Sequence, residues 1–93
     1  MPYWTYILQS ESTDRYYCGS TSDVERRLRQ HNDPEYRHSK TTKRFKGPWA
    51  LVWSQEFKNR SEAMQREKQI KKHGITRFLK EKAQLVESRR RRD

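Results

Sequence analysis

Residues 3–31 read YWTYILQSESTDRYYCGSTSDVERRLRQH. Residues 3–9 are rich in aromatic and β-branched side chains, which favours a strand, and residues 15–20 resume this composition after the polar residues 10–14. The two segments predict a hairpin with a short polar loop. Gly19, near the end of the second strand, indicates either a bulge or a ligand that approaches the backbone closely.

The capping-box pattern of residues 22–25, SDVE, predicts a helix over residues 23–32. Residues 33–48 lack a periodic pattern and predict an exposed basic loop. Residues 49–57 predict a third strand with Trp49, Leu51 and Trp53 on one face. Residues 59–62 begin a second helix that ends at Gly74, and a third helix is expected over residues 76–87.

These elements predict one α+β domain, in which a small three-stranded antiparallel sheet is flanked by about three helices. The domain is expected to span residues 1–88, and the arginine-rich residues 89–93 are expected to form a disordered basic tail. An aromatic content of 12% argues that most of the chain folds, although hydrophobic residues make up only 30%.

The charge balance predicts an anionic partner. Lysine and arginine exceed aspartate and glutamate to give a net charge of +10, for which nucleic acid is the default partner and a membrane surface is not expected. The single cysteine, Cys18, fits a reducing compartment, and no signal-peptide pattern or apolar span is seen. We therefore expect a cytoplasmic protein, whose oligomeric state the sequence does not indicate.

Two polar residues share the inward face of the first predicted helix. Val24 and Leu28 define that face at helical spacing, and Arg27 and His31 fall on it. A charge placed against a core needs a partner, so these residues are candidates for a functional site. The simpler interpretation is that Arg27 extends past its apolar neighbours to solvent and that His31 is a satisfied, partly buried histidine.

The second predicted helix also has a charged residue, Glu67, on its inward face. It lies at helical spacing between Ala63 and Ile70, which mark the inward face. An inward carboxylate needs a cation, either a basic side chain or a metal. The alternative is an ordinary ion pair with a neighbouring lysine on the helix.

Two tyrosines on the predicted strands are further candidates for the site. Alternation places Tyr6 on one face of the first strand, and it places Tyr17 and Gly19 together on one face of the second. The convergence of these tyrosines with Arg27 and His31 is an inference, because the sequence does not fix the register between the strands.

These motifs resemble those of the GIY-YIG nuclease superfamily, and most closely its small stand-alone bacterial members. Residues 4–6, WTY, stand in place of the first motif and residues 17–19, YCG, in place of the second. The resemblance continues through Ser20, Asp23, Arg27, His31 and Glu67. Trp4 replaces the first motif's glycine, Cys18 replaces an aliphatic residue, and an asparagine found near the C-terminus of several members has no clear counterpart.

The resemblance implies a metal-dependent endonuclease that hydrolyses DNA phosphodiester bonds. Glu67 would hold one Mg²⁺ or Mn²⁺ ion, and Arg27 would stabilise the charge of the transition state. Tyr6 or Tyr17 would orient or deprotonate water, for which the pKa of a phenol must fall by about 3 units, and His31 could relay the proton. Arg27, nearby lysines or the metal would favour phenolate.

We expect the DNA to be held through its phosphates, with little sequence specificity or with a preference for branched or single-stranded structure. The candidate nucleic-acid-binding residues are Gly19, Lys40, Lys43, Arg44, Lys46 and Lys71. DNA repair, recombination and defence against foreign DNA are all compatible roles.

Two other functions remain open. One is a catalytically weak or inactive domain of the same fold that binds nucleic acid, and the missing asparagine favours it. The other is a small basic ribosome-associated protein, which explains the charge but not the inward polar residues.

Overall fold

The computed structural model describes residues 2–33 and 48–82. Strands β1 (Tyr3–Ser10), β2 (Tyr16–Thr21) and β3 (Trp49–Phe57) form one antiparallel sheet in the order β2-β1-β3. Helices α1 (Val24–Asn32) and α3 (Arg60–His73) flank it, together with a helix over residues 75–82. The expected α+β class is confirmed, with three antiparallel strands and three helices in the described residues.

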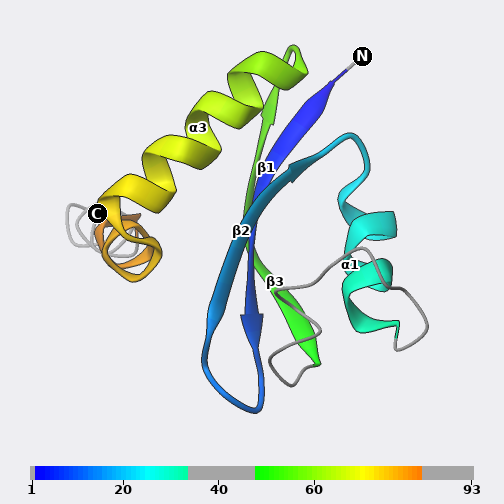
Figure 1. Cartoon of the computed structure of the whole chain (residues 1–93), viewed down its shortest axis with the longest axis vertical. Coiled ribbons are helices and arrows are strands. Elements are labelled where there is room, and N and C mark those ends of the chain that lie inside the picture. Colours follow the sequence, from blue (N-terminus) through cyan, green and yellow to red (C-terminus); the bar gives the residue numbers. More distant parts are fainter. Residues whose placement is uncertain (1, 34–47, 83–93) are drawn as a thin grey trace, which may run out of the picture.

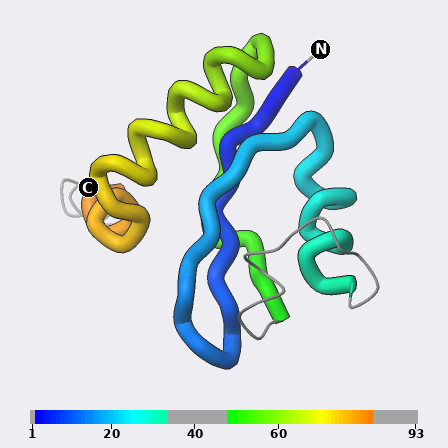
Figure 2. Tube along the Cα trace, viewed as in Figure 1, coloured from blue at the N-terminus to red at the C-terminus, as the bar shows by residue number. Residues whose placement is uncertain are grey.

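The molecule has three layers, with the sheet in the middle (Figure 1). Helix α1 covers one face, whereas α3 and residues 75–82 cover the other. In Figure 2 the helix of residues 75–82, drawn in orange, is seen almost along its axis at the end of α3. Among the described residues, no helix has the length and apolar content needed to cross a membrane.

Several expectations fall on parts of the chain that the structure does not describe. They concern most of the basic loop, the end of the last helix and the boundary with the tail at residue 88. Four candidate DNA contacts also lie outside the described residues: Lys40, Lys43, Arg44 and Lys46. These remain predictions.

The hairpin register brings the two tyrosines to one face, as expected. Tyr6 pairs with Gly19 and Leu8 pairs with Tyr17, so both phenols lie on the side of the sheet that α1 covers. The connecting turn contains Asp14 with a φ of 60°, a conformation that aspartate tolerates better than most residues.

A core lies on each face of the sheet. On the α1 side, the buried residues Tyr6, Leu8 and Trp49 form a cluster, against which Leu28 of α1 packs. The cluster on the α3 side consists of the buried residues Ile7, Cys18, Ile70 and Phe78. Each face needs its own helix layer because successive residues of β1 point to opposite sides.

An irregularity in β3 overturns the expectation that Trp49, Leu51 and Trp53 share one face. Ile7 pairs with Trp53 but the next residue of β1 pairs with Leu51, so Val52 is an extra residue in the ladder. The shift reverses the facing of every position beyond it. Trp49 and Leu51 therefore belong to the α1 face, while Trp53 packs edge-to-face on Phe78 in the other core, with ring centroids 4.9 Å apart.

The helix ends follow the sequence signals closely. The backbone N–H of Arg26 donates to the side chain of Asp23, and that of Glu62 donates to Asn59, over 3.1 and 2.9 Å. Gly74 ends α3 with a φ of 103°, a conformation that favours glycine. Thr5 ties α3 to the sheet, because its buried hydroxyl donates to the backbone oxygen of Ala63 over 2.6 Å.

Asn32, the last residue of α1, anchors the start of β3. Its amide nitrogen donates to the Trp49 carbonyl over 2.9 Å, and its amide oxygen accepts from the Trp49 N–H over 2.7 Å. The side chain thus bonds to both backbone groups of an edge-strand residue, as a neighbouring strand would. This fixes where α1 ends relative to the sheet.

We expect Asn32→Ala to lower the free energy of unfolding by about 1–3 kcal/mol, because two hydrogen bonds to the Trp49 backbone are lost. Asn32→Asp keeps the acceptor but loses the donor, so its loss should be smaller. Urea unfolding of the three proteins measures this. Equal stability of Asn32→Ala and the wild type would show that the contact does not hold α1 in place.

Candidate active site

The phenol of Tyr6 lies at the centre of the candidate site. Its side chain is 1% exposed, and its ring passes directly over Gly19 on the neighbouring strand. A Cβ atom at Gly19 would lie 2.8 Å from Tyr6 Oη and 3.1 Å from Tyr17 Cε1. Glycine is thus needed at this position to make room for both tyrosines.

His31 is held between the two tyrosines. It is 2% exposed, and its Nε2 atom lies 3.0 Å from Tyr6 Oη within hydrogen-bonding distance. The ring centroids of Tyr17 and His31 are 4.9 Å apart, and those of Tyr6 and Tyr17 are 6.1 Å apart. Tyr17 is the half-buried member of this group, so it forms the side that faces outward.

Arg27 brings a positive charge to the same group. One of its terminal nitrogens donates to Gln30 Oε1 over 3.0 Å, and the guanidinium also hydrogen-bonds to the Tyr6 phenol. Burial nevertheless raises the pKa of Tyr6 well above its usual value, and the neighbouring Tyr17 adds to the rise, while Arg27 opposes it. Arg27 thus favours the phenolate in the direction expected, but burial outweighs it and Tyr6 stays neutral.

Glu67 lies on the opposite side of the sheet from this group. It projects from α3, where its Oε2 atom accepts from Lys71 Nζ over 2.7 Å, one helical turn away. The Glu67 side chain is 20% exposed and that of Lys71 is 50% exposed, so the pair sits at the surface. Nearby, burial raises the pKa of the Cys18 thiol to about 12, with a further rise from Glu67 and an opposing effect of Lys71.

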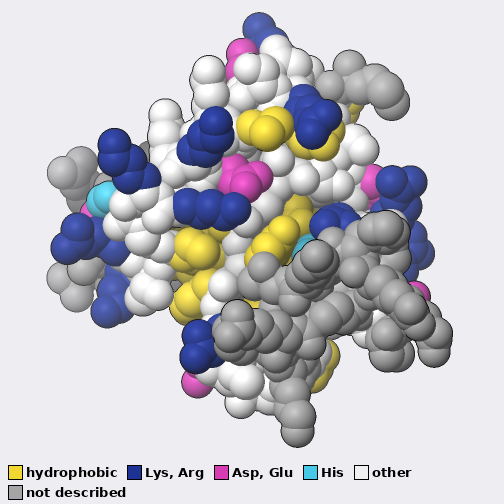
Figure 3. All heavy atoms as spheres, viewed as in Figure 1, with side chains coloured by type: hydrophobic (Ala, Val, Ile, Leu, Met, Phe, Trp, Pro, Cys, Tyr) yellow, Lys and Arg dark blue, Asp and Glu magenta, His cyan; other side chains and the backbone are white. Residues whose placement is uncertain are grey.

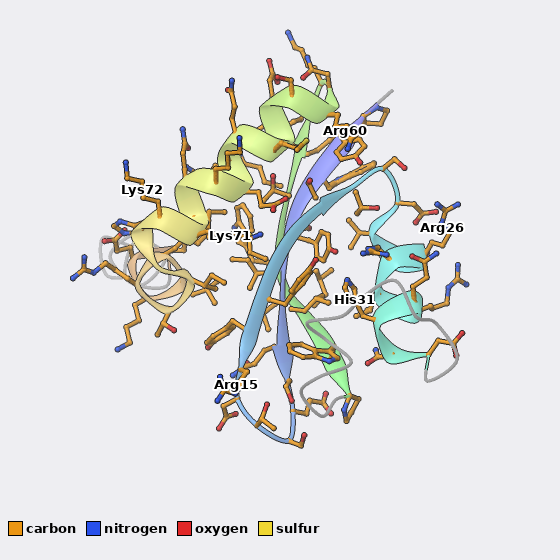
Figure 4. All side chains as sticks on the ribbon, in the orientation of Figure 1. Arg15, Arg26, His31, Arg60, Lys71 and Lys72 are labelled. Atoms are coloured by element: carbon orange, nitrogen blue, oxygen red, sulfur yellow. The ribbon has the colours of Figure 1, made fainter. Side chains whose placement is uncertain are left out.

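Lys71 lies on the other side of β2 from the tyrosines. Burial lowers the pKa of its ammonium, but the hydrogen bond and charge of Glu67, together with Tyr17 and Cys18, outweigh burial and raise it. Figure 4 shows Lys71 and His31 on either side of β2, which is an edge strand of the described sheet. Lys71 and the tyrosine group therefore lie on opposite sides of this edge strand.

The surface over the β2 edge carries acidic, basic and hydrophobic side chains. Figure 3 shows an acidic side chain near the centre of the face, with basic side chains beside it and hydrophobic groups next to them. The structure thus brings together Tyr6, Tyr17, Arg27 and His31 on one side of β2, and it places Glu67 on the other. Gly19 supports the Tyr6 ring.

The possible metal ligands of this site suit an ion that the protein and its substrate bind together. Glu67 offers one partly exposed carboxylate, and residues 2–33 and 48–82 contain no group of three histidine, cysteine, aspartate or glutamate side chains that could hold a metal. Mg²⁺ is commonly bound by one or two carboxylates, with water and substrate phosphate completing its shell. Glu67 fits that arrangement once Lys71 moves aside.

The sequence interpretation missed two residues that shape the site. Gln30 is not among the residues predicted above, yet it holds the guanidinium of Arg27, and its position three residues further along the helix was the available signal. Asn32 gave no such signal, because its partner Trp49 lies outside the helix.

Comparisons with known proteins identify the family of this chain. Residues 2–80 match the family described as the GIY-YIG catalytic domain. The chain belongs to the GIY-YIG family. A UPF0213 protein of Vibrio campbellii is 41% identical to this GIY-YIG protein over 78 residues, which are 84% of this chain and 70% of the relative.

Two further relatives are similar to this GIY-YIG protein. The structure-specific endonuclease subunit SLX1 of Meyerozyma guilliermondii is 42% identical over 66 residues, covering 68% of this chain and 22% of the relative. A UPF0213 protein of Bacillus halodurans, solved by solution NMR, is 31% identical with a TM-score of 0.49, covering 94% of this chain and 84% of that one.

Gly19→Ala should lower the free energy of unfolding by about 1–3 kcal/mol, because the new Cβ meets the buried Tyr6 ring, which has no room to retreat. Urea unfolding measures the loss. In a Tyr6→Phe background the same substitution should cost less, since the 2.8 Å contact with Oη disappears. Identical costs in both backgrounds would contradict the packing of Tyr6 on Gly19.

Proposed function

We propose that this GIY-YIG protein is a divalent-metal-dependent endonuclease that hydrolyses DNA phosphodiester bonds. It cuts with little sequence specificity or with a preference for branched or single-stranded DNA. The observation that carries the proposal is the position of half-buried Tyr17, which packs on buried His31 with the ring centroids 4.9 Å apart. The Glu67–Lys71 pair lies on the other side of the same edge strand, so a hydroxyl, a carboxylate and cations flank β2.

Family membership supports a nuclease. A related protein that covers 68% of this chain is named as a subunit of a structure-specific endonuclease, and the match to the GIY-YIG catalytic domain spans residues 2–80. The net charge of +10 supports a polyanionic substrate. The described site adds side chains that suit hydrolysis rather than simple phosphate binding.

The two tyrosines have different roles in this proposal. Tyr6 is buried and neutral, so it acts by holding His31 and Arg27 in place rather than by taking a proton from water. Tyr17 is half-buried and reaches the surface, so it orients the attacking water or accepts its proton. His31, packed on Tyr17, is placed to share that proton.

The charged residues act on the phosphate. The guanidinium of Arg27 is held by Gln30 beside Tyr6, and its planar fork of N–H groups suits the oxygens of a phosphodiester in the transition state. Lys71 adds an ammonium on the other side of β2 from Tyr17. Glu67 would hold Mg²⁺ or Mn²⁺, which neutralises charge on the leaving oxygen when it is bound.

Glu67→Gln should lower metal-dependent nicking of plasmid DNA by at least about 100-fold, because the charge that holds the cation is lost while the shape remains. DNA affinity measured in EDTA should stay within about twofold of the wild type, since the cation is absent from that measurement. The matched control is Glu62→Gln in the first turn of the same helix, which should nick normally. Normal cutting by Glu67→Gln would remove Glu67 from the proposal.

Tyr17→Phe should lower the turnover number by about 10²–10⁴-fold without a comparable loss of stability or binding, because only the outward hydroxyl is removed. Tyr6→Phe should instead lower the free energy of unfolding by about 1–3 kcal/mol, since buried His31 loses its hydroxyl partner. Single-turnover cleavage and urea unfolding separate the two effects. A stability loss without a turnover loss for Tyr17→Phe would contradict its role.

One experiment distinguishes cleavage from binding alone. Plasmid, branched DNA and RNA are each incubated with the purified protein in Mn²⁺ or in EDTA. Nicking of DNA that requires Mn²⁺ supports the nuclease. Binding of DNA without cutting would favour a catalytically inactive domain, and binding of RNA alone would favour a ribosome-associated protein.

A further inference from the structure

A surface hollow of about 440 Å³ lies next to the Glu67–Lys71 pair. Its walls come from the hairpin turn, the beginning of β2, the last turn of α3 and the start of the helix over residues 75–82. The lining residues are Asp14, Arg15, Tyr16, Lys71, Ile75 and Thr76. Its volume falls in the range of roughly 300–1,000 Å³ that is typical of pockets for small ligands.

The hollow combines positive charge with an apolar wall. Arg15 and Lys71 each bring a cation to it, whereas Asp14 brings one carboxylate. Tyr16 and Ile75 pack against the core on the α3 side but stay partly exposed. Cations that meet phosphate, beside an aromatic ring that meets a base, are the combination with which proteins hold single-stranded nucleic acid.

Lys71 places this hollow beside the proposed reaction centre. Its Nζ atom lies 2.7 Å from Glu67 Oε2, while the same side chain lines the hollow. Figure 4 shows Arg15 near the hairpin end of β2 and Lys71 further along the same face. In Figure 3 hydrophobic side chains are exposed on this face beside α3, with basic groups near them.

We propose that the hollow formed by Arg15, Tyr16, Lys71 and Ile75 binds one unpaired nucleotide of the DNA strand, next to the phosphodiester that is cut. The base lies against Tyr16 and Ile75, and Arg15 and Lys71 contact the phosphates on either side of the nucleotide. This inference rests on the proposed function, because it takes the Glu67 site to be where the strand is cut.

The chemistry of the wall requires the nucleotide to be unpaired. A base inside a duplex has both faces covered by its stacked neighbours, so it has no face to offer to Tyr16. A strand that leaves the duplex, as at a flap or a fork, presents such a face without the cost of unstacking. The hollow therefore favours branched DNA and single strands over intact duplex.

The direct test is an NMR titration of the full chain with a six-residue thymidine oligonucleotide in EDTA, where no cutting occurs. We expect the amide signals of residues 14–16, 71, 75 and 76 to shift together. Shifts confined to α1 and β3 would overturn the proposal.

Variants of Tyr16 measure how much its ring contributes to oligonucleotide binding. Tyr16→Leu should weaken oligonucleotide binding by about 5- to 150-fold, which is the range for loss of one base stacked on an aromatic ring. Tyr16→Phe should bind as the wild type does, because the ring is kept. Thermal unfolding checks that both variants are folded. If a folded Tyr16→Leu variant binds the oligonucleotide as tightly as the wild type, the proposal is overturned.

Charge variants test the phosphate contacts. Arg15→Gln and Lys71→Gln should each reduce the slope of log affinity against log salt concentration by about 0.7, the value for one contact to a single strand. The matched controls Arg60→Gln and Lys72→Gln remove the same charge outside the hollow, and Lys72 points away from β2 in Figure 4. Equal slopes for Arg15→Gln and Arg60→Gln would overturn the proposal.

Cleavage separates this inference from the proposed function. If the wild type cuts DNA in Mn²⁺ while the hollow variants bind the oligonucleotide normally, the inference fails and the nuclease stands. If the oligonucleotide fills the hollow but no DNA is cut, the proposed function fails, and with it the placement of the nucleotide beside a cleaved bond. A fork cut faster than a blunt duplex, with that preference lost in Tyr16→Leu, supports both.

Discussion

The packing of the Tyr6 ring on Gly19 is the contact on which the rest of the structure depends. It requires one register between β1 and β2, because a shift of one residue would place a side chain under the ring. Once the ring is seated, its hydroxyl lies 3.0 Å from His31 and within reach of Arg27, which sets the position of α1. The hairpin thus fixes the helix through a buried polar contact as well as through apolar packing.

Much of the fold could be predicted because its signals are local. The strands and helix ends follow from composition and caps such as Asp23 and Asn59, which interact with residues three positions away. The extra residue at Val52 could not be predicted, because a strand pattern does not reveal which partner residues it will face. That one insertion lets β3 send Trp49 to one core and Trp53 to the other.

The candidate site, like the fold, could be predicted from the sequence only in part. Helical periodicity was enough to identify Arg27 and His31 as inward-facing residues, and the structure places both beside Tyr6. The sequence could not predict whether Tyr6 is neutral or ionised. Burial raises the pKa of Tyr6 and Arg27 lowers it, and only the folded structure shows that burial dominates. The sequence also gave no indication that Glu67 lies across β2 from the tyrosines, since that depends on which face of the sheet α3 covers.

The place of β2 at the border of the described sheet limits how copies of this chain can assemble. Sheets often grow by adding a strand from another molecule to an edge. A strand added along β2 would run across Tyr17 and Lys71 and close the approach to both. Association through β2 and access of a large substrate would therefore exclude one another, whereas association through β3 would leave that approach open. A peptide that extends the sheet at β2 through main-chain hydrogen bonds would therefore act as a competitive blocker.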